Sequence, residues 1–349
     1  MQIYPKVNQP ESMHKKLLCE GMEVSRKPPV NYAEISGDRS FIELKEYIEP
    51  TYLLQVSNAL VSPYGIAVKN GRVIPESVYS MFTRNRHLLT FVKKIALGKV
   101  RRVTGDCLLV HNAYYDNYYH WTLEALPRLY SVREHTRDLT LLIHEKTRPF
   151  IEDYLSFFRF KNIVPIKDDE IVLAPKLWLP THTARGLRHN ERLVREMAAY
   201  LKARVPSGVA PGGPGKVFIS RRGAAYRQAL NEPEVYALLR EHGFERIRLE
   251  DLKLTEQINL FRGVKVLTGI HGAGFSNLIY MDAGEHLVDM IHERHAQNAF
   301  YTLACAFGLD YTRLECRGVG KSDYEGNDDL VVDLDRVRKY FPAAAPRPL

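Results

Sequence analysis

The sequence predicts an α/β protein with two domains, and three observations support this. Short apolar runs alternate with amphipathic helical stretches, both before residue 205 and after residue 215. The 349 residues are more than one hydrophobic core usually serves. Between the two series lies a segment rich in proline and glycine, 206–215, which can support neither a helix nor a central strand and is therefore predicted to be a linker.

The first half of the chain opens without a clear pattern and then turns to strands. Residues 1–50 are predicted to be an N-terminal extension, because Pro28-Pro29 and Gly37-Asp38 interrupt them. Residues 52–73 have a strand-like pattern, and Asn70-Gly71 between apolar runs predicts a hairpin turn. The further elements predicted before the linker are strands at 107–110 and 139–143 and helices at 117–129, which Pro127 should kink, and 148–158.

The second half repeats the alternation. Gly243 follows a helical stretch in the position typical of a C-terminal capping glycine. The elements predicted here are strands at 217–220, 246–249, 264–268 and 286–291 and helices at 232–241, 255–261 and 275–280. We therefore expect domains at 51–205 and 216–340, followed by a frayed tail at 341–349.

Composition narrows the class of protein. The hydrophobic fraction of 45% and the charged fraction of 26% are typical of a globular fold. The net charge of +8 suits an anionic partner, but the basic residues are scattered, and the sequence has no basic helix or RNA-binding motif. A nucleic-acid partner is therefore disfavoured, and a generally basic soluble protein accounts for the charge equally well. The four cysteines have no C-x-x-C spacing, which argues against a zinc knuckle or a redox pair.

Membrane insertion is not indicated. The first residues show no apolar run of the kind found in signal peptides, and no stretch approaches ~18 consecutive apolar residues. The expectation is a cytoplasmic protein, whose contact with the inner membrane, if any, is peripheral.

The first candidate site follows the strand at 264–268. His271-Gly272-Ala273-Gly274 forms a loop of small residues that opens a short helix containing Asn277. Such a loop lets a phosphate approach backbone N–H groups at a helix N-terminus, beyond the carboxyl end of a strand. The alternatives are a tight turn that needs small residues and a dinucleotide site. The glycines do not match G-x-G-x-x-G, although Asp289 ends the next strand and keeps an NAD(P)-binding enzyme open.

The second candidate site follows the strand at 217–220. Arg221, Arg222 and Arg227 lie just beyond the strand end, and Glu232 opens the next helix. Arginine suits bidentate contacts with phosphate, and Glu232 can cap its helix or accept hydrogen bonds from a ribose. The alternative is a solvated basic turn. Two phosphate-suited loops in one domain favour a shared anion site.

The third candidate site is on the helix predicted at 117–129. His120 and Glu124 are four residues apart and share one helical face. This pair suits a general base that deprotonates a hydroxyl, although a structural ion pair would have the same spacing. H-x-x-x-E lacks the second histidine of a zinc-protease motif, so no metal site is indicated. The other candidates in this segment are Asn117, Arg128, and Trp121, which could stack on a ligand or fill the core.

These motifs occur in an order that resembles glycosyltransferase family 61, which includes bacterial capsular-polysaccharide proteins. The likeness spans roughly residues 105–292 and rests on the ordered set rather than on any single motif. The matching residues are Asn117-Tyr118-Tyr119-His120-Trp121, Glu124-Ala125-Leu126-Pro127-Arg128-Leu129, Ile219-Ser220-Arg221-Arg222, Asn231-Glu232, Glu256-Gln257-Ile258 and His271-Gly272-Ala273-Gly274-Phe275-Ser276-Asn277-Leu278-Ile279-Tyr280-Met281.

The resemblance implies a GT-B-like fold, in which two Rossmann-like domains face each other across a cleft. It implies inverting transfer from a UDP-linked or similar nucleotide sugar, with neither a cofactor nor an obligatory metal. Arg221 or Arg222, Glu232 and the 271–274 loop would lie at the donor, and His120 and Glu124 at the acceptor. Nothing in residues 1–100 matches a pattern that would identify the acceptor.

The working hypothesis is that arginines and backbone N–H groups stabilise the departing diphosphate. His120, or a carboxylate such as Glu124 or Asp116, would deprotonate a glycan or lipid-linked acceptor in capsule or surface-polysaccharide synthesis. Two alternatives remain: a catalytically silent scaffold in a polysaccharide assembly complex, and an NAD(P)-dependent enzyme.

Overall fold

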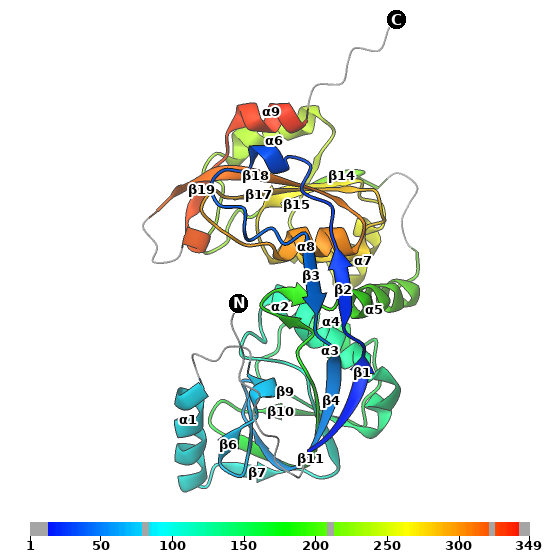
Figure 1. Ribbon diagram of the computed structural model, residues 1–349, viewed down its shortest axis with the longest axis vertical. Coiled ribbons are helices and arrows are strands. Elements are labelled where there is room, and N and C mark those ends of the chain that lie inside the picture. The colour runs from blue at the N-terminus through cyan, green and yellow to red at the C-terminus, as the bar shows by residue number, and fades with distance from the viewer. Residues whose placement is uncertain (1–12, 79–83, 208–212, 321–324, 342–349) are drawn as a thin grey trace, which may run out of the picture. The chain divides into compact units, whose positions relative to one another are not determined.

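The computed structural model describes residues 13–78, 84–207, 213–320 and 325–341 (Figure 1). The chain divides into two compact units. Unit 1 contains residues 1–22 and 48–186, and unit 2 contains residues 23–47 and 187–349. The central part of the predicted linker, 208–212, and residues 342–349 of the predicted tail lie outside the described residues.

Unit 1 is built around a mixed sheet with the strand order β10-β9-β8-β11-β4-β5-β6, in which β1 also pairs with β4 and β7 with β11. The strands β8, β9, β10 and β11 run parallel, whereas β4 is antiparallel to β11. The strands are β1 Met13–Cys19, β4 Thr51–Val61, β5 Ala67–Lys69, β6 Arg72–Val73, β7 Val100–Arg102, β8 Asp106–Leu109, β9 Thr140–His144, β10 Asn162–Ile166 and β11 Ile171–Pro180. The helices are α1 Arg84–Ala96, α2 Tyr118–His120, the π-helical η4 Trp121–Ala125, α3 Leu126–Ser131 and α4 Pro149–Leu155.

The core of unit 1 lies on this sheet. Val56, Ala59 and Val61 on β4 are fully buried and pack with apolar residues of β8 and β11. The predicted hairpin is confirmed: Asn70 and Gly71 join β5 to β6 with φ of 49° and 69°, as a type I′ turn requires.

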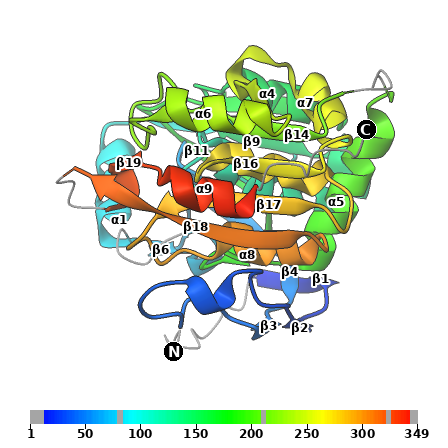
Figure 2. The same cartoon turned by 90° about the horizontal axis from the view of Figure 1, so that it is seen from above.

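Unit 2 has a second sheet with the order β15-β14-β16-β17-β18-β19, parallel except for β19. The strands are β14 Lys216–Ile219, β15 Glu245–Ile247, β16 Val266–Ile270, β17 His286–His292, β18 Asp310–Val319 and β19 Asp329–Val331. The helices are α5 Glu191–Arg204, α6 Glu232–Glu241, α7 Leu254–Phe261, the 3₁₀ helix η7 Ala273–Tyr280, α8 Ala299–Ala306 and α9 Leu334–Tyr340. Figures 1 and 2 show α6 and α9 on one face of this sheet and α8 on the other.

The strand order of unit 2 has a functional consequence. When the strands of this sheet are numbered from β14, its parallel strands follow the order 2-1-3-4-5. This is a doubly wound order, whose topological switch point lies between the first and third strands. Here those strands are β14 and β16, so the switch point lies where the predicted donor loops begin. The prediction of an α/β protein is confirmed, and the two sheets are consistent with two Rossmann-like domains.

The unit boundaries differ from the predicted domains 51–205 and 216–340. Helix α5 belongs to unit 2 because its apolar face, which includes Leu193, Val194 and Met197, is buried, and the helix packs against η7 and α8. The predicted extension 1–50 is also divided: β1 extends the sheet of unit 1 beside β4, whereas residues 23–47 join unit 2.

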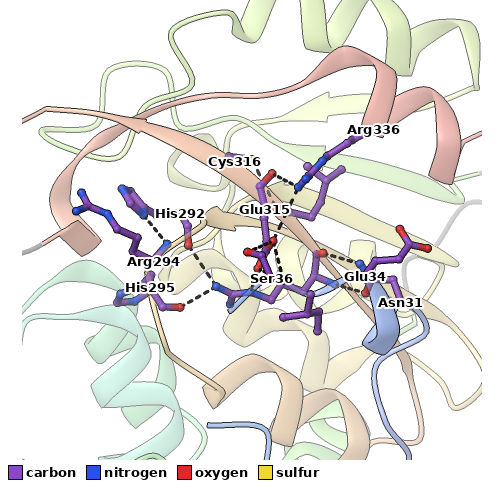
Figure 3. Close-up of polar contacts among 12 residues, drawn as sticks. Asn31, Glu34, Ser36, His292, Arg294, His295, Glu315, Cys316 and Arg336 are labelled. Carbon is purple, nitrogen blue, oxygen red and sulfur yellow. Dashed lines mark hydrogen bonds and ion pairs between the residues drawn. The ribbon is translucent and has the colours of Figure 1, made fainter. Parts of the chain in front are cut away.

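Residues 23–47 are tied to β18 by polar contacts (Figure 3). The Asn31 side chain donates to Arg313 O at 2.8 Å and accepts from Arg313 N at 3.1 Å. Both the backbone N–H and the hydroxyl of Ser36 donate to the buried carboxylate of Glu315. Sequence periodicity could not predict this, because the partners are about 280 residues apart.

We expect Asn31→Ala to destabilise unit 2. The substitution leaves two backbone groups of β18 without their partners, which costs about 1–3 kcal/mol for each buried unsatisfied group. The midpoint of urea unfolding should fall, whereas Lys45→Ala, at an exposed position on β3 (Lys45–Ile48), should leave it unchanged. An unchanged midpoint for Asn31→Ala would mean that the segment contributes little to the stability of unit 2.

Candidate functional site

The switch point of unit 2 brings two loops together. The strands β14 and β16 are hydrogen-bonded neighbours, with Ile219 opposite Gly269. Gly269 has φ of +153°, and a Cβ there would lie 2.7 Å from the carbonyl oxygen of Ile219. Both the backbone angle and the close approach require glycine here. Because the two strands are hydrogen-bonded neighbours, the loops that leave them emerge side by side.

Arg221 lies directly against the loop after β16. A Cβ on Gly272 would overlap the Arg221 guanidinium, so glycine at this position lets the guanidinium lie on the loop backbone. Arg221 donates to the carbonyl oxygens of Tyr226 and Arg227, both at 3.1 Å. Burial, followed by the charge of Arg227, lowers the pKa of Arg221 to about 10, so the guanidinium stays charged at neutral pH.

Arg227 reaches the same loop from a strained backbone. Its φ is +57°, and its Nη1 donates to the carbonyl oxygen of His271 at 3.3 Å, whereas its Nε is buried without a hydrogen-bond partner. Arg222 is exposed, and its backbone N–H donates to Ser220 Oγ. Within the described ranges, none of the three arginines forms an ion pair with a carboxylate. The loop thus carries concentrated positive charge, and Glu250 acts on Arg221 through its charge without forming an ion pair.

The His271 ring is held by the protein. It is 3% exposed, and its Nδ1 lies 2.9 Å from Asp289 Oδ2 and its Nε2 2.6 Å from Gln297 Oε1. Asp289 also accepts from the Tyr311 hydroxyl at 3.0 Å. The ring therefore fixes the position of the 271–274 backbone. Phe275 N–H makes the first bond of η7, to Gly272 O, so the N–H groups of Ala273 and Gly274 precede this ladder and are suited to bind an anion.

Two other predicted donor residues hold loops in place. Glu232 is 4% exposed and accepts from Ser220 Oγ at 2.6 Å, with Arg246 Nη1 at 3.9 Å. Asn277 is fully buried and donates to Gln257 Oε1 at 2.9 Å. Both side chains are occupied inside unit 2, so the structure brings together Arg221, Arg227 and the 271–274 loop rather than the whole predicted set.

In unit 1, His120 and Glu124 meet as the spacing predicts. His120 Nδ1 lies 2.9 Å from Glu124 Oε2, and because a carboxylate can only accept, Nδ1 carries the proton. Glu124 is 1% exposed and also accepts from Asn112 Nδ2 at 2.7 Å, a partner that the sequence analysis missed. The His120 side chain is 17% exposed.

This pair lies where the helix changes its winding. Residues 121–125 form a π-helical turn closed by Leu126 N–H donating to Trp121 O. Pro127 follows immediately and has no N–H to continue an α-helical ladder, which accounts for the predicted interruption. Such π-helical turns are frequent at functional sites.

The side chains of the remaining predicted residues of this segment make other contacts. Asp116 is exposed and lies 3.4 Å from Arg148. Asn117 caps α2 by accepting from Tyr119 N and His120 N. Trp121 is 2% exposed and packs in the core, and Arg128 is 1% exposed and donates to Pro180 O and Val110 O. An acceptor-side role for Trp121 and Arg128 stays a prediction, because helical spacing alone does not distinguish a buried face from a ligand-facing one.

Metal-ligand groups and membrane-spanning helices are two further features that bear on function. In the ranges that the structure describes, no group of three or more His, Cys, Asp or Glu side chains could hold a metal ion. No helix in those ranges combines the length and the apolar character needed to span a bilayer.

Comparison with known proteins places these residues in a family. Residues 118–288 match the family model for glycosyltransferase 61. The chain is also 30% identical over 113 residues to the EGF domain-specific O-linked N-acetylglucosamine transferase of Drosophila melanogaster. That alignment covers 32% of this chain and 21% of the relative, so the chain spans about a fifth of the relative's length. The match includes both the His120–Glu124 pair and the 271–274 loop, and it identifies residues 118–288 as a glycosyltransferase family 61 region.

Proposed function

We propose that the chain transfers a sugar from a nucleotide-sugar donor to an acceptor hydroxyl. The observation that carries this proposal is the group of arginines at the switch point, in which Arg221 lies on Gly272 and forms no ion pair with a carboxylate among the described residues. A nucleoside diphosphate supplies the missing negative charge, and the family supplies the reaction.

In the proposed reaction, Arg221, Arg227 and the N–H groups of the first turn of η7 bind the diphosphate. As the glycosidic bond breaks, negative charge grows on the leaving phosphate, and these fixed donors stabilise it more than they stabilise the substrate. The arginines and backbone N–H groups supply the positive charge that a metal ion supplies in other enzymes. We therefore propose that no metal is obligatory.

The proposed base is His120. Because Nδ1 donates to Glu124, Nε2 is left as the acceptor for a proton from the acceptor hydroxyl. Glu124 then stabilises the imidazolium that forms, as the third member of a catalytic triad does. Attack on the anomeric carbon from the face opposite the diphosphate inverts its configuration. We further propose that the two Rossmann-like units make up a GT-B-like fold.

The direct test is release of nucleotide from a panel of donors: UDP-N-acetylglucosamine, UDP-glucose, UDP-xylose, GDP-mannose and CMP-sialic acid. The N-acetylglucosamine donor is included because of the relative's name. We expect one diphosphate donor to be consumed, with turnover unchanged by EDTA. Consumption of CMP-sialic acid alone would contradict the diphosphate site. If no donor is consumed in the presence of glycan, lipid-linked and protein acceptor pools, the result would favour a catalytically silent scaffold.

A further inference from the structure

A pair of adjacent tyrosines lies beside the His120–Glu124 pair in unit 1. Tyr114 and Tyr115 are in the loop that follows β8, at the edge of the sheet where parallel β8 and β9 both end. This is the edge at which open α/β sheets bind ligands. The nearby Tyr64, in the turn between β4 and β5, has its ring centroid 6.3 Å from that of Tyr115. We call Tyr64, Tyr114 and Tyr115 the tyrosine shelf.

The shelf residue nearest the proposed base is Tyr114. Its ring stacks on the His120 imidazole, with centroids 4.6 Å apart and planes 19° from parallel. Even so, Tyr114 is 48% exposed, a large exposure for an aromatic ring held in a fixed orientation. An exposed ring that already covers one face of the base lies where an acceptor must approach it.

The same buried groups hold both the ring and the base. Asn112 is 3% exposed; its Oδ1 accepts from Tyr114 N at 2.9 Å, and its Nδ2 donates to Glu124 Oε2 at 2.7 Å. Glu124 in turn accepts from His120. The position of Tyr114 is therefore set by the group that orients the base, which favours a joint role over an incidental surface aromatic.

Tyr115 extends the aromatic surface on a second rigid support. Its ring stacks on His144 at 3.9 Å between centroids, with planes 9° apart. Because Lys146 N donates to His144 Nδ1, the proton is on Nε2, which donates to Asp168 Oδ1 at 2.9 Å. Tyr64 donates to the same carboxylate at 3.1 Å and is 37% exposed.

We infer that the tyrosine shelf is the acceptor subsite and that Tyr114 stacks against the C–H face of a pyranose ring, placing a ring hydroxyl near His120 Nε2. This inference rests on the proposed glycosyl transfer. An aromatic ring with a hydroxyl at its edge combines an apolar face for sugar C–H groups with a hydrogen-bonding tip. The shelf supplies three such rings, of which Tyr114 stacks on the base, and so fits a glycan acceptor better than a purely apolar one.

The test is saturation-transfer difference NMR with the full chain and methyl pyranosides of glucose, galactose, xylose and N-acetylglucosamine, with glycerol as the non-ring control. We expect ring C–H signals from at least one pyranoside and none from glycerol. Tyr114→Leu, which keeps apolar volume without an aromatic face, should weaken that binding by about tenfold. Tyr114→Phe should retain most of it, and Tyr47→Ala, at a tyrosine that is 54% exposed on β3, should change nothing.

Two outcomes would overturn the subsite. One is that no pyranoside gives a signal above glycerol; the other is binding that is indifferent to Tyr114→Leu in a variant with the wild-type melting temperature. If Tyr114→Leu does not fold, pyranoside binding is measured with Tyr114→Phe and Tyr115→Leu instead, because both substitutions change the same aromatic surface. Binding of UDP to these variants is recorded in parallel. Loss of UDP binding with Tyr114→Leu would assign the ring to the donor, whereas intact UDP binding with no sugar effect would refute the shelf and leave the proposed function standing.

Discussion

His120→Ala should lower kcat for glycosyl transfer by about 10²–10⁴-fold, the contribution of a positioned general base. His120 has a buried carboxylate on Nδ1 and a partly exposed ring, which is the arrangement a base needs. The affinity for nucleoside diphosphate should stay unchanged, because the histidine lies in unit 1 and the proposed phosphate site in unit 2. Steady-state kinetics with titration of the diphosphate measures both quantities.

Two companion variants make this result specific. His14→Ala, at an exposed histidine on β1, should leave kcat unchanged. Glu124→Gln removes the charge that stabilises the imidazolium, and should lower kcat. If His120→Ala keeps wild-type turnover, the base is another group, and Asp116 is the next candidate to substitute.

Arg221→Ala should lower kcat/KM for the donor by about 10²–10³-fold, as loss of one oxyanion donor does in other enzymes. The guanidinium lies on Gly272 with its charge unpaired, so its removal takes away a contact with the diphosphate that strengthens as the bond breaks. Arg221→Lys should recover only part of the activity, because an ammonium group cannot reproduce the planar fork that donates to Tyr226 O and Arg227 O.

The control for Arg221 is Arg240→Ala, which removes an exposed arginine on α6 and the same formal charge. Equal losses in the two variants would indicate a general electrostatic effect of the basic chain rather than a phosphate site. Equal turnover of Arg221→Ala and wild type would mean that the donor assignment is wrong.

Local patterns in the sequence predicted much of the fold. The helix at 232–241 has the predicted bounds, and Gly243 follows it with φ of +79°. The helix predicted at 255–261 begins one residue earlier, at Leu254, and its capping position is Lys253, whose N–H donates to Glu256. The placement of residues 23–47 and of α5 in unit 2 could not be predicted, because it depends on contacts with distant segments such as β18 and η7.

The candidate site shows the same division. The pairing of His120 with Glu124 follows from i, i+4 spacing, and the meeting of Arg221 with the 271–274 loop follows from two loops at one sheet edge. The partners Asn112 and Gln297 could not be predicted, because tertiary packing brings them to Glu124 and His271. The expectation that Asp289 ends its strand was wrong: it lies within β17, where it contacts His271.

The most direct test of the central claim, a diphosphate site at the switch point of unit 2, is calorimetric titration of the wild-type chain. UDP, GDP and dTDP are compared with the matching monophosphates and with NAD and NADP, all in EDTA. We expect that one diphosphate binds and that its monophosphate binds at least about tenfold more weakly, because a charged contact is lost. We also expect that Arg221→Ala abolishes the difference in affinity between the two nucleotides. Binding of NAD or NADP alone, or of a monophosphate as tightly as its diphosphate, would contradict the central claim.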